Sequence, residues 1–147
     1  MDLSMTREER WTFVTEVPRV GVLSIEAPGR GPVSSPIWFT GTADSPDGTG
    51  GELAFSVGPE SRKAVLLGQT GRATMCVQSE VVPYQYVVME GPVEARGPSD
   101  DAFIHDLAVR YLGPDLGELY FAGVRDDPSV LFALTPQRWS TLDYHKV

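Results

Sequence analysis

The 147-residue chain carries 12 lysine and arginine residues against 20 aspartate and glutamate residues, a formal net charge of −8. This length suits one domain with its own core, and we expect a single domain over residues 1–147. The excess negative charge repels phosphate backbones and anionic lipid surfaces, so neither nucleic acid nor a membrane is an expected partner. Its one cysteine, Cys76, cannot form an internal disulfide, which favours the cytoplasm, and its apolar neighbours predict a buried, inert thiol.

The first half of the chain predicts one helix, several strands and a second, shorter helix. Thr6 and Glu9 have the spacing of a capping box, and the helix they begin is expected to run to about Val17. Ser61 can cap the short helix, which we expect to end before Gly68. Strands are expected at 20–25, 33–42 and 53–57.

The second half predicts more strands, with helical segments between them. Ser99 opens a helix that Gly113 and the following proline close, and a further helical piece is expected over about 116–122. Strands are expected at 72–79, 84–94, 130–135 and 138–143. Six or seven strands with short helices between them predict an antiparallel β-barrel flanked by helices, an α+β fold that is mainly β.

The strongest chemical pattern is Ser61-Arg62-Lys63. It places a hydroxyl, a guanidinium and an ammonium on the first turn of a helix that follows a strand, where free N–H groups and the helix dipole favour an anion. Lysine occurs only at Lys63 and Lys146, which draws further attention to Lys63. On the residues alone, a capped helix with two solvated cations is an equal alternative.

Aromatic residues on the predicted strands are weaker candidates for binding. Pro36 lies within the run Ser35-Pro36-Ile37-Trp38-Phe39 and removes a backbone donor, which indicates a sheet edge, a bulge or a ligand site. Trp38 and Phe39 can equally be packing residues. The same alternative holds for Tyr84 and Tyr86, which share a strand face.

Hydrolytic and metal-dependent chemistry is not expected. His105 and His145 are far apart in sequence, neither has a convincing second ligand, and both are expected at the surface. No nucleophile elbow or metal-ligand spacing accompanies the serine, histidine and acidic residues. The residues around Ser99 to Asp101 are interpreted as a helix start, and those around Arg125 to Pro128 as a turn.

In their order and spacing, several segments resemble the pyridoxamine 5'-phosphate oxidase-like split barrels, which include FMN enzymes and relatives that use the deazaflavin coenzyme F420. The resemblance covers nearly the whole chain and rests on the first helix with Val20–Ile25, on Ser35–Phe39, Phe55–Ser56, Ser61–Ala64, Arg72–Met75, Val87–Val93 and Leu134–Trp139. It implies a split barrel and a homodimer in which the second subunit completes the cofactor site.

The resemblance also implies which residues hold the cofactor. Arg62 and Lys63 would bind its phosphate, with Ser61 supporting them. The ring would be flanked by Ser35, Pro36, Ile37, Trp38, Phe39, Ser56 and Val57. The candidates from the second subunit are Gln85 or Tyr86, and Trp139.

The chain departs from the family where the oxidases bind vitamin B6. It has neither a basic second strand nor a C-terminal arginine-histidine pair, so pyridoxamine 5'-phosphate oxidation is not expected. We expect an FMN- or F420-dependent reductase of a small conjugated or carbonyl-type molecule. FMN is favoured by the Ser61-Arg62-Lys63 segment and the lack of a basic groove for an anionic tail, whereas arginine-rich, lysine-poor usage fits an actinobacterial source with F420. The alternative is a non-catalytic flavin carrier or a barrel that binds a small ligand or tetrapyrrole.

Overall fold

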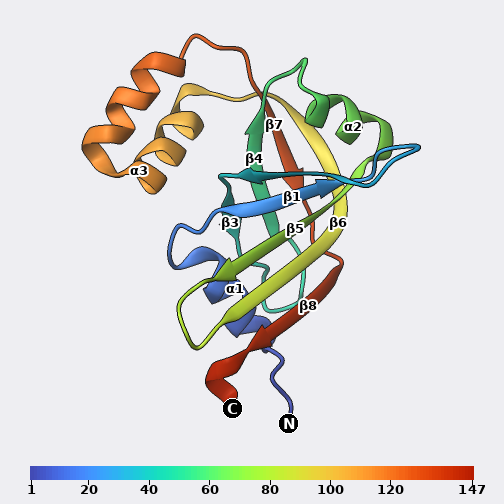
Figure 1. Ribbon diagram of the computed structural model, residues 1–147. Coiled ribbons are helices and arrows are strands. Elements are labelled where there is room, and N and C mark those ends of the chain that lie inside the picture. Colours follow the sequence, from blue (N-terminus) through green and yellow to red (C-terminus); the bar gives the residue numbers. More distant parts are fainter.

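The computed structural model describes all 147 residues and contains one curled antiparallel sheet (Figure 1). Its strands are β1 (Gly21–Ile25), β2 (Val33–Ile37), β3 (Thr40–Thr42), β4 (Glu52–Val57), β5 (Arg72–Ser79), β6 (Gln85–Pro98), β7 (Val130–Leu134) and β8 (Arg138–Asp143). The helices are α1 (Arg7–Thr15), α2 (Arg62–Thr70) and α3 (Asp101–Val124), and a 3₁₀ turn, Tyr144–Lys146, follows β8. None of these helices is both long and apolar enough to cross a membrane.

The sheet curls into a barrel that stays open between two edge strands. Its order is β2-β1-β5-β6-β7-β4-β3, and β8 pairs with β6 outside this path. The long strand β6 joins the two halves, because its first part pairs with β5 and β8 and its last part with β7. This arrangement confirms the predicted split barrel with short flanking helices.

The predicted strand over 33–42 is interrupted, and this is one correction to the sequence analysis. β2 pairs with β1 at one sheet edge, whereas β3 pairs with β4 at the other. Trp38 and Phe39 carry the chain across the opening between these edges. The Phe39 N–H donates to the Tyr111 hydroxyl at 3.1 Å rather than to a strand, so the ladder is broken there.

Three other local expectations are also corrected. Helix α2 continues through Gly68 to Thr70 and is capped by Gly71, whose φ of +66° is the left-handed conformation that glycine adopts more readily than other residues at a helix end. Helix α1 begins with the predicted Thr6–Glu9 capping box but ends at Thr15. Cys76 alternates outward from β5 and is only half-buried, so the predicted burial is wrong, although desolvation still raises the pKa of the thiol.

The barrel interior contains only apolar side chains. Alternate residues of β5 and β6 point inward, among them Met75, Val77, Val87 and Met89, each fully buried. No polar or charged residue is buried. The strands therefore form a closely packed frame on which the surrounding loops and helices are held.

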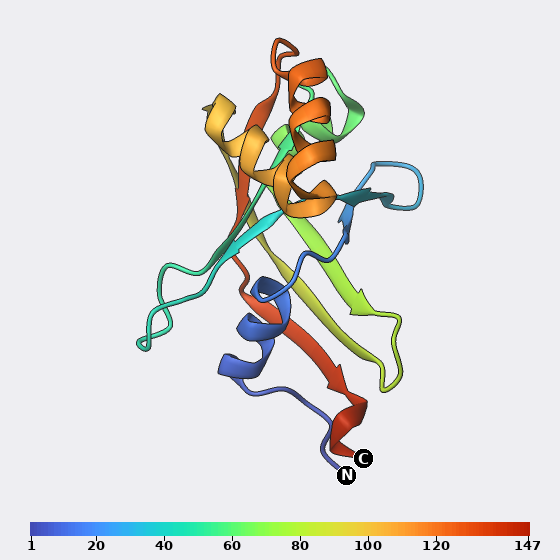
Figure 2. The same cartoon turned by 90° about the vertical axis from the view of Figure 1, so that its left-hand side faces the viewer.

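Helix α3 is a hairpin of two helical arms that stands to one side of the barrel (Figures 1 and 2). The break lies at Gly113, with φ +83°, followed by Pro114, as the sequence predicts. The arms pack closely because Gly117 has no side chain: a Cβ atom there would lie 2.7 Å from the Val109 Cα. His105 and Glu118 form a further link between the arms.

Candidate functional site

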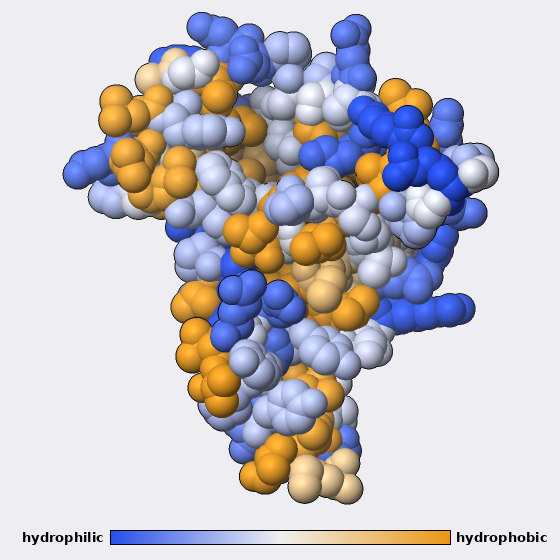
Figure 3. Space-filling view, in the orientation of Figure 1, coloured by the Kyte–Doolittle hydropathy of each residue, from blue (hydrophilic) through white to orange (hydrophobic).

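A cleft of about 450 Å³ lies between the α3 hairpin and the open edge of the barrel. The barrel wall of the cleft consists of Pro36, Ile37, Trp38, Ser56, Val57 and Gly58. The hairpin wall consists of Ile104, Leu107, Tyr120 and Val124. Figure 3 shows apolar side chains gathered over α3 and a hollow between that helix and the barrel. Five of the residues predicted to flank a cofactor ring are thus brought together in one cavity.

Three aromatic rings join the hairpin to the barrel beside this cleft. Trp38 stacks on Tyr111, with ring centroids 5.1 Å apart and an interplanar angle of 5°, and it meets Tyr120 at 5.3 Å. The Tyr111 hydroxyl donates to the Arg19 carbonyl at 2.8 Å and accepts from the Phe39 N–H. Burial raises the pKa of Tyr111, so the hydroxyl keeps its proton for this bond.

Two predicted ring contacts lie away from the cavity. Phe39 is buried in the core, because the residue after Trp38 points to the opposite side of the chain. Ser35 lies on β2 opposite the buried Leu23, and its hydroxyl is buried without a hydrogen-bond partner. Neither side chain lines the cleft.

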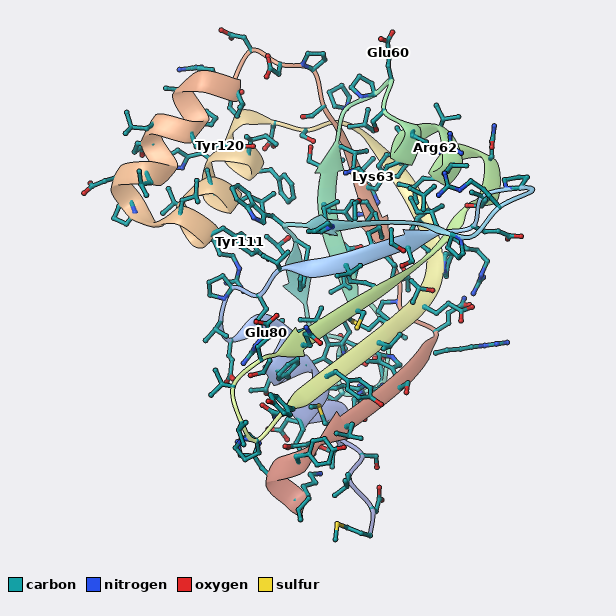
Figure 4. The ribbon with its side chains drawn as sticks, in the orientation of Figure 1. Glu60, Arg62, Lys63, Glu80, Tyr111 and Tyr120 are labelled. Atoms are coloured by element: carbon teal, nitrogen blue, oxygen red, sulfur yellow. The ribbon has the colours of Figure 1, made fainter.

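The first turn of α2 lies next to the cleft, because Gly58 lines the cavity and the helix begins four residues later. The Ser61 hydroxyl accepts from the Ala64 N–H at 3.2 Å and donates to the Gly58 carbonyl at 2.7 Å, which confirms the predicted cap. Arg62 is exposed and Lys63 half-buried, and neither makes a side-chain hydrogen bond or ion pair. Figure 4 places Lys63 between α2 and the strands, whereas Glu60 points away from the molecule.

The residues predicted to act from a second subunit do not line the cleft of their own chain. Gln85 and Tyr86 begin β6, where they pair with Asp143 and Leu142 of β8. Trp139 packs edge-on against Trp11, with centroids 5.0 Å apart. The Arg10 guanidinium lies 4.0 Å from the Trp139 ring centroid.

Sequence reasoning missed the hairpin half of the site. Asp100 caps α3 by accepting from the Phe103 N–H at 2.8 Å, as the interpretation of a helix start requires. The neighbouring Asp101 also lines the cleft, as do Arg125 and Asp127 from the predicted turn. A helix start and a turn of this kind are common in proteins and do not by themselves indicate a binding site. These residues reach the cavity only because the hairpin folds against the barrel.

Both histidines lie outside the cleft and have carboxylate partners. Glu118 and then Asp106 raise the pKa of His105, and the Nδ1 of His145 is 2.8 Å from Asp143. No group of three or more histidine, cysteine, aspartate or glutamate residues is arranged to hold a metal ion.

The curled sheet, open between β2 and β3 and flanked by α2 and α3, defines a split β-barrel protein. The sequence profile of the pyridoxamine 5'-phosphate oxidase family matches residues 7–143, and the chain belongs to that family. No curated protein sequence matches the chain significantly.

Solved structures support the fold. A "conserved hypothetical protein" from Mycobacterium tuberculosis is 22% identical with a TM-score of 0.72, over 99% of this chain and 89% of the other. A protein named as an F420 reductase is 22% identical with a TM-score of 0.65, over 88% and 94%. An FMN-binding protein related to pyridoxamine 5'-phosphate oxidase, from Nostoc punctiforme, is 19% identical with a TM-score of 0.58, over 86% and 75%.

Proposed function

We propose that this protein is an oxidoreductase that holds FMN or coenzyme F420 along the barrel wall of the cleft and reduces a small conjugated or carbonyl-type molecule. The observation that carries the proposal is the pair Arg62 and Lys63. Both lie without a partner on the first turn of a capped helix that starts beside the cavity. Cations and free N–H groups at a helix N-terminus are suited to a phosphate.

The shape and lining of the cleft fit a flat ring. Its volume of about 450 Å³ is in the range of cofactor pockets. Ile37 and Val57 supply an apolar surface, and the Ser56 hydroxyl supplies a group that can donate or accept. A bound flavin or deazaflavin supplies hydride transfer, so these residues need only orient the ring and exclude water.

The charges of the cleft favour FMN over coenzyme F420. Arg62 and Lys63 offer two positive charges on the first turn of α2, enough for a single phosphate. Among the residues that line the cavity itself, Asp101 and Asp127 are acidic and Arg125 is the one cation. A longer anionic tail, such as that of F420, would be repelled there.

We further propose a homodimer, in which Gln85 or Tyr86, and Trp139, complete the cofactor site of the partner subunit. Two observations support it. These residues lie outside the cleft of their own chain, and large apolar side chains remain exposed around the β5–β6 connection. Val81 is 74% exposed, Val82 69% and Tyr84 51%. Such a patch is typical of an interface between subunits.

A carrier without turnover is the second candidate. The cleft contains no histidine, and both of its carboxylate residues, Asp101 and Asp127, are exposed rather than enclosed. Proton transfer in an enclosed site ordinarily uses such groups. A protein that binds flavin and lacks them is suited to holding the cofactor without using it.

One titration series tests the cofactor assignment. Purified protein is titrated with FMN, riboflavin and F420, and binding is followed by absorbance and fluorescence. We expect tight binding of FMN, weaker binding of F420, and weaker binding of riboflavin, which lacks the phosphate. Reductant-dependent turnover across quinones, enones and tetrapyrroles then separates an enzyme from a carrier. Absence of binding by both FMN and F420 would contradict the proposal.

A further inference from the structure

We infer that the hairpin wall of the cleft is a second binding site, which takes a flat apolar molecule that carries no negative charge. The inference rests on the proposed function, because a flavin on the barrel wall leaves the hairpin wall for the molecule to be reduced. It names the substrate class of that cleft. It also identifies Tyr120 and Asp127 as the residues that determine specificity.

The first observation is the apolar lining. Ile104 and Leu107 lie three residues apart on the first arm of α3, and Tyr120 and Val124 lie four apart on the second. These spacings place each pair on one face of its arm. The close contact at Gly117 holds the two arms together, so the two faces make one continuous wall. Tyr120 is 44% exposed beside Trp38, an aromatic surface open to a flat ligand.

The second observation is the charge at this end of the cleft. Asp101 is paired with Arg125 at 3.4 Å, but Asp127 has no cation partner. Asp100 and Asp126 lie next to these residues in sequence and are also exposed. Arg62 and Lys63, on α2, do not line the cleft. The unpaired charge of Asp127 and its acidic neighbours therefore repel an anionic group from the hairpin wall.

The third observation is a small polar floor between the two walls. The Ser56 and Ser99 hydroxyls lie 2.7 Å apart, and both residues are half-buried. Ser129 is held beside them, because its carbonyl accepts from the Ser99 N–H at 3.0 Å. Hydroxyl groups can donate to an oxygen of an uncharged ligand. This floor is compatible with a carbonyl or amide and offers no cation to neutralise a carboxylate.

The test uses three ligands that share one bicyclic ring and differ in charge: 2-naphthamide, 2-naphthylmethylammonium and 2-naphthoate. Dissociation constants are measured by ligand-observed NMR with the full-length protein. Inorganic phosphate is present in excess, so that Arg62 and Lys63 are occupied and do not capture the naphthoate. We expect the amide and the ammonium to bind about tenfold more tightly than the naphthoate.

Variants assign the binding to the hairpin wall. Tyr120→Ala should weaken the amide and the ammonium by about fivefold or more, because the aromatic surface is lost. Val124→Ser tests the same wall with a smaller change and should weaken both ligands in the same direction. The control is Leu119→Ala: Leu119 is 72% exposed on the same arm and does not line the cleft, so its loss should change nothing.

A second pair of variants isolates the effect of the Asp127 charge on ligand selectivity. Asp127→Asn should reduce the discrimination against naphthoate by about threefold. Glu26→Gln makes the same change of net charge at an exposed position outside the cleft and should leave the discrimination intact. Equal binding of the three ligands, no binding of any, or unchanged affinities in both Tyr120→Ala and Val124→Ser each overturn the inference. None of these measurements requires flavin, so a failure of the proposed flavin function appears separately in the cofactor titration.

Discussion

The barrel and the α3 hairpin are held together in different ways. The main core contains 21 buried apolar residues from α1, α2, the strands and their connections, and none of them belongs to α3. The hairpin buries only Leu107, Ala108 and Gly117 and is secured by the aromatic contact at Trp38 and a few polar links. The cleft thus has one wall on a rigid frame and one wall on a lightly attached unit. The first is suited to positioning a cofactor, and the second can adapt to its ligand.

The largest expected effect is a loss of stability when a side chain in the barrel core is removed. Phe55 is fully buried and stacks with Phe132, with ring centroids 6.0 Å apart. Phe55→Ala should lower the free energy of unfolding by about 3–5 kcal/mol, because the cavity it leaves cannot collapse between packed strands. Urea denaturation followed by circular dichroism measures the change. Leu116→Ala, at an exposed hairpin position, should cost less than about 0.5 kcal/mol. Similar losses in the free energy of unfolding for the two variants would contradict the conclusion that the barrel and the hairpin are held together in different ways.

The next effect concerns binding at the barrel wall. Arg62→Ala and Lys63→Ala should each weaken FMN by roughly ten- to a hundredfold, because each removes a charge-assisted contact to phosphate. Riboflavin affinity and thermal stability should hardly change. Arg138→Ala is the matched control, since Arg138 is also an exposed cation without an ion-pair partner. Fluorescence titration gives the affinities. An undiminished preference for FMN over riboflavin in the double variant would refute the phosphate assignment.

A smaller effect tests how the hairpin is attached. Tyr111→Phe keeps the ring on Trp38 but removes the hydroxyl that accepts from the Phe39 N–H and donates to the Arg19 carbonyl. We expect a loss of about 1–2 kcal/mol, felt mainly by the hairpin. Hydrogen exchange should accelerate in α3 and stay unchanged in β6. Equal acceleration in both elements would show that the hairpin and the barrel open as one unit.

The smallest effect is a pH dependence within the hairpin. Glu118 raises the pKa of His105 in the folded protein above its ordinary value of 6.5. The His105–Glu118 contact is therefore fully present below that ordinary value and is lost as the pH rises through the raised pKa. Thermal stability should fall slightly over that interval in the wild type and not in His105→Gln. NMR titration should show a lower pKa for His105 in Glu118→Gln, and an unchanged pKa would show that Glu118 does not cause the shift.

The sequence predicts the barrel well because each strand carries its own pattern. Alternation in β5 and β6, the capping box at Thr6 and the cap at Ser61 depend on neighbours a few residues away. The interruption at Trp38 and Phe39 could not be predicted, because its cause is Tyr111, 72 residues from Phe39. The same reason explains why only the barrel wall of the site was anticipated. The hairpin wall depends on a packing arrangement that no local pattern records.

The passage of the chain through Trp38 and Phe39 has a mechanical consequence. Two residues connect the two edges of the open sheet, and a peptide segment of that length spans roughly 7 Å at full extension. The edges are therefore tethered at this point and cannot slide apart, so any widening of the seam must be a rotation about it. Trp38 lies at the pivot and its ring stacks on the hairpin. A ligand that tilts the strands is expected to turn the indole relative to Tyr111, so a change in the stacking of these two rings would report that rotation.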